Sequence, residues 1–136
     1  MIGLVVATHG TLGEALLATA AMIVGEPLRA CAVSLSRDSA PEELRVRLTE
    51  AIAAVDDGDG VLLAVDMFGG TPANIGMTLL DAGRIELLTG VNLPMLLKFF
   101  TYRERYPLPA LAETLKAQAR EGIVLAGEVL GRPPGR

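Results

Sequence analysis

The sequence predicts an α/β fold, with an open and mostly parallel sheet of four strands and helices on both faces. Short apolar runs alternate with longer amphipathic segments about four times along the chain, which is the pattern of repeated strand–helix units. The short runs are apolar throughout, as expected of parallel strands buried on both faces. A chain of 136 residues, 51% of them hydrophobic, suits one domain, which we predict over residues 1–130.

The first half of the chain contains two such units. We predict a strand at residues 2–7, a helix at 11–24, a strand at 28–35 and a helix at 41–55. The first helix has apolar residues at helical spacing and ends at Gly25. Ser39 is placed to cap the second helix, and Glu42, three residues later, completes a capping box.

The second half repeats the pattern with shorter elements. We predict a strand at residues 60–65, a helix at 71–81, a strand at 84–88, a helix after Asn92 and a last helix at 108–120. Thr71 and Asn92 are expected to cap the helices that they begin. Residues 123–130 form a final apolar segment, predicted as a strand. Residues 131–136, which are only Gly, Pro and Arg, are expected to be a disordered tail or a linker stub.

Composition excludes several classes of function. The net charge is −4 and no basic run is present, so nucleic-acid binding has no electrostatic support. No apolar stretch of about 18 residues is present to span a membrane, and no basic segment precedes the first apolar run. Cys31 is the only cysteine and reads as a small buried hydrophobe. We therefore expect a cytoplasmic protein.

Candidate functional residues follow the predicted strands. His9, the only histidine, follows the first strand, and Asp66 follows the third. Ligands of open parallel sheets bind at the carboxyl ends of the strands, near the point where the strand order reverses. If the first and third strands are neighbours, His9 and Asp66 meet above the sheet. The residues after the fourth strand, 89–92, would lie at the same edge.

That pair has a clear chemical use. A carboxylate that accepts a hydrogen bond from Nδ1–H fixes the tautomer of His9 and leaves Nε2 as a nucleophile. The carboxylate also stabilises the positive ring that forms when Nε2 gains a bond. A structural histidine and a turn-forming aspartate are the plain alternatives for the two residues.

Phosphoryl transfer would also need groups that stabilise an anion. The helix starts at Gly10 and Thr11 and at Gly69, Gly70 and Thr71 would supply backbone N–H groups. The Thr71 hydroxyl would either reach a phosphate oxygen or cap its own helix. Met67 and Phe68 are expected to pack in the core, with contact to a partner protein as the alternative.

Other chemistries have less support. The chain has no G-x-x-x-x-G-K-[ST] phosphate loop, no G-x-G-x-x-G fingerprint and no G-x-S-x-G nucleophile elbow. A metal site with one histidine would need several carboxylates from loops, and only Asp66 is well placed. We therefore predict no metal and no cofactor.

Three sequence blocks resemble one family. These are IGLVVATHG at residues 2–10, DMFGGTPAN at residues 66–74 and GVNLPML at residues 90–96. In this order, and over roughly residues 1–130, they resemble the IIA component of the mannose family of the bacterial phosphoenolpyruvate-dependent sugar phosphotransferase system. The second block is similar to the D-[LM]-F-G-G-[ST]-P-x-N signature of that family.

The resemblance implies a phosphotransferase component with a phosphohistidine intermediate. His9 would accept a phosphoryl group from phospho-HPr at Nε2 and pass it to a IIB component, while Asp66 orients the ring and Thr71 helps to hold the phosphate. The resemblance also implies a homodimer in which the last strand, residues 123–130, is exchanged between subunits. The membrane would be reached only indirectly, through IIC and IID components.

Several alternatives stay open at this stage. The chain ends after a short Pro/Gly tail, so we expect either a separate IIB protein or a regulatory IIA that controls a protein partner without sugar uptake. A donor domain for dihydroxyacetone phosphorylation and a ligand-binding module of flavodoxin-like shape are less favoured by the three blocks. The sequence names no sugar.

Overall fold

A four-stranded parallel sheet forms the centre of the computed structural model, which describes residues 1–131. Its strands are β1 (Gly3–His9), β2 (Ala30–Leu35), β3 (Val61–Val65) and β4 (Ile85–Leu88), in the spatial order β2-β1-β3-β4. Every pairing between these strands is parallel, which confirms the predicted open sheet. The chain moves from β1 to β2 and then returns to the other side of β1, so the strand order reverses between β1 and β3.

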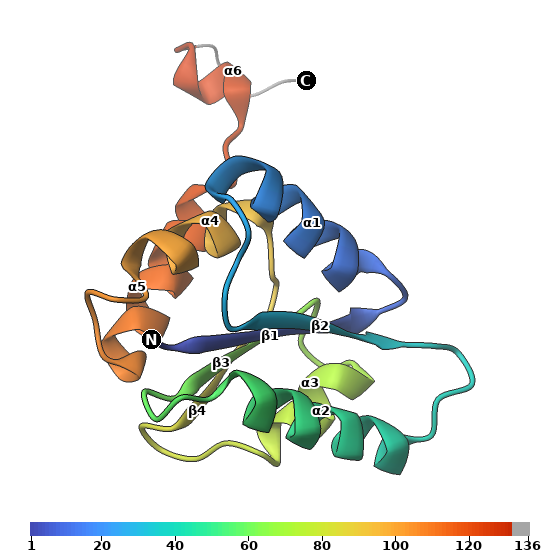
Figure 1. Ribbon diagram of the computed structural model, residues 1–136. Helices are drawn as coiled ribbons and strands as arrows, with labels where there is room; N and C mark the ends of the chain where they lie inside the picture. Colours follow the sequence, from blue (N-terminus) through green and yellow to red (C-terminus); the bar gives the residue numbers. More distant parts are fainter. Residues whose placement is uncertain (132–136) are drawn as a thin grey trace.

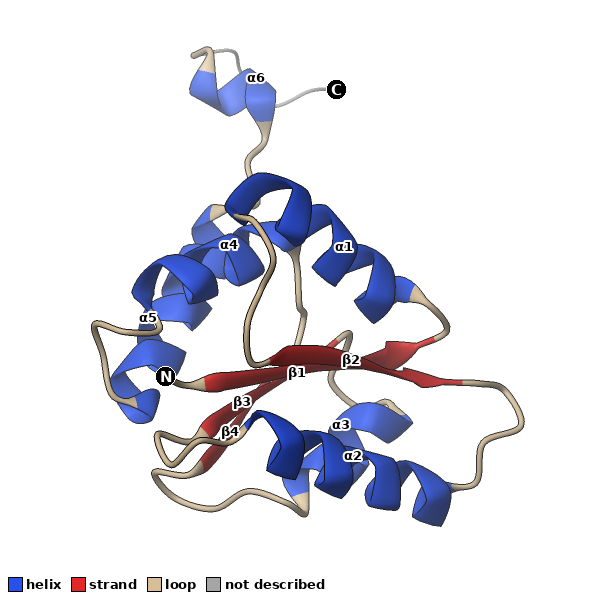
Figure 2. Cartoon of the chain, in the orientation of Figure 1, coloured by secondary structure: helices blue, strands red, loops and turns tan. Residues whose placement is uncertain are grey.

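Helices cover both faces of the sheet. One face carries α1 (Leu12–Val24), α4 (Leu93–Tyr102) and α5 (Leu108–Glu121), and the other carries α2 (Pro41–Val55) and α3 (Thr71–Met77). Figure 1 shows these two layers above and below the strands, and Figure 2 shows the sheet enclosed between them. No helix within residues 1–131 is long and apolar enough to cross a bilayer.

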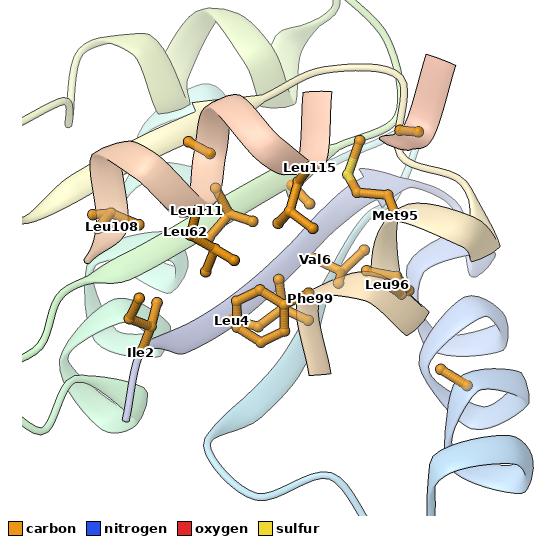
Figure 3. Packing of buried hydrophobic residues seen from close by; sticks show 14 residues of the cluster. Ile2, Leu4, Val6, Leu62, Met95, Leu96, Phe99, Leu108, Leu111 and Leu115 are labelled. Carbon is orange, nitrogen blue, oxygen red and sulfur yellow. The ribbon is translucent and has the colours of Figure 1, made fainter. Parts of the chain in front are cut away.

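Alternate residues of the strands supply two separate cores. On the side of α1, α4 and α5, Leu4 and Val6 of β1 pack with Leu62 of β3 and Phe99 of α4 (Figure 3). Residues of opposite parity on the same strands pack against α2 and α3. Because successive strand residues point to opposite faces, both faces of β1 and β3 must be apolar, and this explains their uninterrupted apolar sequences.

The start of α2 differs from the prediction. Ala40 is the N-cap residue and no side chain caps this helix. The Ser39 hydroxyl oxygen instead accepts a hydrogen bond from the Ser36 N–H at 3.1 Å, within a turn closed by Ser39 N–H and Ser36 C=O. The predicted capping box of Ser39 and Glu42 is therefore wrong, because the local turn uses the hydroxyl first.

The bounds of α3 also differ. Gly70, not Thr71, is its N-cap residue, and the helix ends at Met77 rather than near Asp81. The backbone N–H and C=O of Asp81 both pair with Ile85, at the entry to β4, so they are not free to extend the helix. The cap of α4 is confirmed, since the Asn92 side chain accepts a hydrogen bond from the Met95 N–H at 2.9 Å.

The C-terminal segment is not a strand within this chain. Ala126–Val129 form the short helix α6, which stands away from the sheet and its helices (Figure 1). The large apolar side chains of the segment are exposed. A strand needs a neighbour to pair its backbone groups, and this segment does not lie on the edge of its own sheet, so a local turn satisfies them instead. Of the predicted tail, residues 132–136 lie outside the described residues.

Candidate functional site

His9 and Asp66 meet at the carboxyl edge of the sheet, above the point where the strand order reverses. His9 is the last residue of β1, and Asp66 directly follows β3. Because β1 and β3 pair in register, with Ala7 opposite Val65, both residues leave the sheet at the same level. Nδ1 of His9 lies 2.8 Å from Oδ2 of Asp66, and the His9 backbone N–H donates to the same oxygen at 2.9 Å.

The environment of Asp66 favours its charged form. Partial burial on its own raises the pKa of this carboxyl, but hydrogen bonds from the ring and backbone of His9 outweigh it, so the pKa of Asp66 lies below its ordinary value. The Met67 N–H donates to the second carboxylate oxygen at 3.1 Å. A carboxylate only accepts hydrogen bonds, so Nδ1–H of His9 is the donor, and in the neutral ring Nε2 then holds the free lone pair.

The two members of the pair differ in accessibility. The Asp66 side chain is 13% exposed and the His9 side chain is 48% exposed. The anion is thus held inside the edge of the sheet while the ring that it orients faces the surroundings. This arrangement can present a nucleophilic nitrogen to a group carried by another molecule.

Gly70 lies directly against the imidazole of His9. A Cβ atom built on Gly70 would stand 2.8 Å from Cε1 and 3.5 Å from Nε2 of His9. Only a residue without a side chain leaves the ring in its present place. Gly69 has a φ of +86°, a backbone conformation that favours glycine. Gly70 therefore lets the backbone pass close to the imidazole, and Gly69 provides the positive φ that the turn requires.

The remaining predicted phosphate contacts surround the same edge. Gly10 and Thr11 connect His9 to α1, and Thr71 is the first residue of α3. Thr11, the N-cap residue of α1, makes no side-chain capping hydrogen bond, and the N-cap residue of α3 is Gly70 rather than Thr71. The sequence-based alternative in which Thr71 caps its own helix is therefore wrong.

Met67 and Phe68 do not pack in the core, contrary to the sequence-based expectation. Their side chains are 54% and 70% exposed, on the loop that carries Asp66. This loop lies outside both apolar clusters because it projects past the end of β3. Two large apolar side chains thus stand free beside the His9–Asp66 pair.

A hollow of about 1020 Å³ lies at the opposite, amino-terminal edge of the sheet, where Met1, Arg29, Asp57 and Arg103 line it. Neither His9 nor Asp66 lines this hollow. Site and hollow are therefore distinct.

One residue of the site region was missed by sequence reasoning. Thr8, next to His9, is fully buried, and its hydroxyl oxygen accepts a hydrogen bond from the Gly13 N–H at 2.8 Å. A polar residue inside an otherwise apolar strand was the available signal. A buried hydroxyl needs a partner, and a helix start five residues later offers a free N–H.

Comparison with known proteins decides the family. The family model described as PTS system fructose IIA component (EIIA-man) matches residues 3–116. The chain belongs to the mannose family of IIA components. Mannose-family IIA proteins are phosphotransfer components of sugar transport by the phosphotransferase system, so the resemblance carried by the three sequence blocks is confirmed.

Two curated relatives support this assignment. The PTS system fructose-specific EIIA component of Bacillus subtilis (strain 168) is 31% identical over 131 residues, covering 96% of this chain and 90% of the relative. The PTS system mannose-specific EIIAB component of Escherichia coli (strain K12) is 32% identical over 124 residues, covering 90% of this chain. The matched region is 38% of that longer protein.

Solved structures of phosphotransferase-system IIA proteins share the fold. The phosphotransferase system component EIIA from Streptococcus agalactiae superposes with a TM-score of 0.86 at 24% identity, covering 94% of this chain and 99% of that one. The PTS IIA protein associated with the fucose utilization operon of Streptococcus pneumoniae gives a TM-score of 0.84 at 25% identity. That match covers 94% of this chain and 95% of that one.

Proposed function

We propose that this mannose-family IIA protein carries a phosphoryl group on Nε2 of His9, accepting it from phospho-HPr and passing it to a IIB component. The observation that carries the proposal is the pairing of an exposed His9 with a largely buried Asp66 at 2.8 Å. Family membership supports the two protein partners. A cytoplasmic location is part of the same proposal and rests on the family.

The transfer step follows from the tautomer. The Nε2 lone pair of His9 attacks phosphorus while the bond between phosphorus and the donor's imidazole nitrogen breaks, and the bonding electrons return to the donor ring. Nδ1 of His9 keeps its proton, so the ring becomes positive, and the Asp66 carboxylate at 2.8 Å stabilises that charge. Passage to IIB is the same exchange, with His9 as the leaving imidazole.

The phosphoryl group needs donors for its oxygens, and backbone supplies them at two loops. We assign this role to the Thr11 N–H before α1 and to the N–H groups of Gly69, Gly70 and Thr71 at the start of α3. The Gly10 N–H already donates to the Leu35 carbonyl, so Gly10 serves the site through its turn. The Thr11 hydroxyl makes no capping bond and Thr71 is not the cap residue of α3, so both hydroxyls are available to a phosphate. The backbone groups are already ordered before phosphate arrives, which suits transfer to a developing dianion.

The partners dock beside His9 in this proposal. The exposed Met67 and Phe68 stand on the loop that also carries Asp66, and they favour contact with a partner protein over a core role. An open site suits a phosphoryl group that is handed from one protein to another. An enclosed pocket would keep the two imidazoles apart.

A homodimer is the proposed assembly. Ile123, Val124 and Leu130 are 79%, 61% and 67% exposed, and they leave a segment of apolar side chains unpaired in the single chain. β4 forms one edge of the sheet, with a neighbour on one side only. Addition of residues 123–130 of one subunit to the β4 edge of another would cover both features.

The regulatory alternative shares the His9 chemistry and differs in the partner. In that case the phosphorylation state of His9 controls binding to a regulatory protein, and no sugar is taken up. Transport by membrane IIC and IID components is the output that we favour, because the family model and both curated relatives are named for sugar-specific systems.

The test is phosphate uptake by the purified protein. Incubation with phosphoenolpyruvate, enzyme I and HPr should give a stoichiometric, acid-labile phosphate on wild type and none on His9→Ala. Addition of a IIB protein should then remove the label. Labelling of His9→Ala, or no labelling of wild type, would contradict the proposal.

A separate experiment tests whether phosphorylation of His9 serves sugar transport or regulation. Deletion of the protein in its host should abolish uptake of one sugar if it serves transport. If uptake is unchanged, and the phosphorylated and unphosphorylated forms bind a regulatory protein differently, the regulatory alternative replaces the transport role.

A further inference from the structure

Thr8 is a polar residue in the apolar strand β1, directly before His9. It is fully buried, and its side chain lies on the opposite face of the sheet from that of His9 because strand residues alternate. Its hydroxyl oxygen accepts a hydrogen bond from the backbone N–H of Gly13, in the first turn of α1, at 2.8 Å. The expected cap residue of that helix, Thr11, makes no side-chain capping bond. Thr8 of β1 therefore caps α1 instead of Thr11.

Gly13 allows this contact by bringing the helix unusually close to the strand. A Cβ atom built on Gly13 would stand 3.1 Å from the Val6 carbonyl oxygen and 3.3 Å from the Thr8 hydroxyl oxygen. Such distances are tighter than ordinary van der Waals contacts, so any side chain would push the first turn of α1 away from β1. The contact between β1 and α1 therefore depends both on the Thr8 hydroxyl and on the absence of a side chain at Gly13.

The turn between strand and helix is held from both sides. Gly10 has a φ of +58°, and its N–H donates to the Leu35 carbonyl of β2 at 2.8 Å. The Thr8–Gly13 bond closes the other side. Between these two bonds lie the Thr11 and Leu12 N–H groups, for which no acceptor is found among residues 1–131. The backbone beside His9 is thus fixed in place with its donors unused.

We propose that Thr8 is a positioning residue for phosphoryl transfer. By accepting the Gly13 N–H, its hydroxyl holds the first turn of α1 at a set position relative to His9, so that the unused N–H groups meet the phosphoryl group as it reaches Nε2. The inference rests on the proposed function of His9 and adds a residue to it. Ordered donors stabilise a transferring anion without reorganisation, and a displacement of the turn by a fraction of an ångström slows transfer.

The experiment compares Thr8→Val with Thr8→Ser. Valine keeps the shape of threonine and removes the acceptor, while serine keeps the hydroxyl. Phosphorylation is followed with phospho-HPr and, separately, with phosphoramidate, whose P–N bond breaks with release of ammonia and which needs no protein docking. We expect Thr8→Val to slow the maximal rate about tenfold with both donors, with little change in the KM for phospho-HPr, and Thr8→Ser to stay close to wild type.

Two further variants separate positioning from general loss of stability. Gly13→Ala displaces the same N–H without touching Thr8, so it should slow transfer like Thr8→Val, and it decides the question if Thr8→Val fails to fold. Leu111→Val removes a methylene from the buried core of α5, far from the turn, and should lower the melting temperature without slowing transfer per folded molecule.

Nitrogen-15 spectra of the imidazole give an independent readout. In Thr8→Val the Nδ1–H tautomer of His9 should be retained, because the bond to Asp66 is intact, whereas Asp66→Asn should disturb it. Slow transfer with a normal tautomer is the signature of a displaced turn.

The outcomes separate the two proposals. If wild type is phosphorylated on His9 but Thr8→Val and Gly13→Ala react as fast as wild type, Thr8 has no positioning role and the inference is overturned. If Leu111→Val slows transfer as much as Thr8→Val, the cause is general loosening, which also overturns it. If wild type takes up no phosphate, the proposed function fails first and this inference fails with it.

Discussion

The two edges of the sheet use their polar groups in opposite ways. At the carboxyl edge, Asp66 accepts hydrogen bonds from the backbone and ring of a half-exposed His9. At the amino edge, the buried Arg103 donates to the carbonyl oxygens of Ile2 at 3.0 Å and Leu28 at 2.8 Å, and so ties β1 to α4 and to the loop before β2. One edge keeps a nitrogen available for chemistry, and the other uses its cation to satisfy buried backbone.

That difference separates reactivity from stability along one strand. β1 begins beside Arg103 and ends at His9. The guanidinium also lies 4.9 Å from the centre of the Phe99 ring, inside the packed layer of α4. Changes at the amino edge should therefore act on the free energy of unfolding, and changes at the carboxyl edge on the rate of phosphoryl transfer.

The largest expected effect is on catalysis at the carboxyl edge. Asp66→Asn should slow phosphorylation by phospho-HPr about 100-fold, because the amide neither fixes the tautomer of His9 nor stabilises the positive ring. Asp57→Asn, at the amino edge, is the matched control and should leave the rate unchanged. Equal rates for wild type and Asp66→Asn would remove the proposed role of Asp66.

The next effect is on stability at the amino edge. Arg103→Met should lower the free energy of unfolding by about 3 kcal/mol, because the backbone carbonyls of Ile2 and Leu28 lose the donor that Arg103 supplies. Denaturant titration measures the change. Arg105→Met, on an exposed side chain, should alter it by less than about 0.5 kcal/mol.

The folded Arg103→Met protein should still transfer phosphate at the wild-type rate. A transfer rate that falls in proportion to stability would show that the two edges are coupled. The assignment of stability to the amino edge and reactivity to the carboxyl edge would then be wrong.

A smaller effect is expected when the ring of His9 is displaced. Gly70→Ala places a methyl group 2.8 Å from Cε1, so the imidazole must turn away and the maximal transfer rate should fall about tenfold. Gly122→Ala makes a similar overlap, 2.8 Å from the Pro94 ring, and no atom of His9 is among the three atoms nearest to it. That control should not slow transfer; if both variants are slowed alike, the contact with the ring is not the cause.

The smallest effect is the pH dependence of stability due to Asp66. Its pKa is lower in the folded protein than its ordinary value, so the unfolded chain binds more protons in the interval between the two. The contribution of Asp66 is therefore complete above the ordinary value of about 4 and is lost as the pH falls through the lower folded value.

Denaturant titrations of wild type and Asp66→Asn between neutral and strongly acidic pH measure this effect. The difference in unfolding free energy between them should be constant near neutrality and should shrink only below about pH 4. A difference that shrinks near neutrality would point to another titrating group.

Much of the fold could be predicted from the pattern of residues. The uninterrupted apolar runs around Val5 and Leu63 indicated parallel strands, and Asn92 was recognised as a cap from its position alone. The pairing of His9 with Asp66 followed once β1 and β3 were assumed to be neighbours. These are cases in which local chemistry and tertiary structure agree.

The errors in assigning helix caps share one cause. Ser39 resembles a helix cap, but its hydroxyl is used by Ser36. Thr71 resembles one as well, but Gly70 takes the cap position. Thr8, in contrast, caps α1 from inside a strand. The N–H that a hydroxyl binds depends on which backbone groups the fold brings to it, so the residue type alone does not identify a helix cap.

The strand–helix alternation, the family and the two residues on which the chemistry is proposed to depend can all be recognised in the order of the residues. Periodicity and motif order are local properties, so they can be read without coordinates. Three features required the folded structure: Arg103 bonds the backbone at the amino edge, Thr8 bonds the turn beside His9, and residues 126–129 form a helix away from the sheet. Those features depend on contacts between segments far apart in the chain, or on which of several groups a side chain binds. Both are settled only when the helices pack against the sheet.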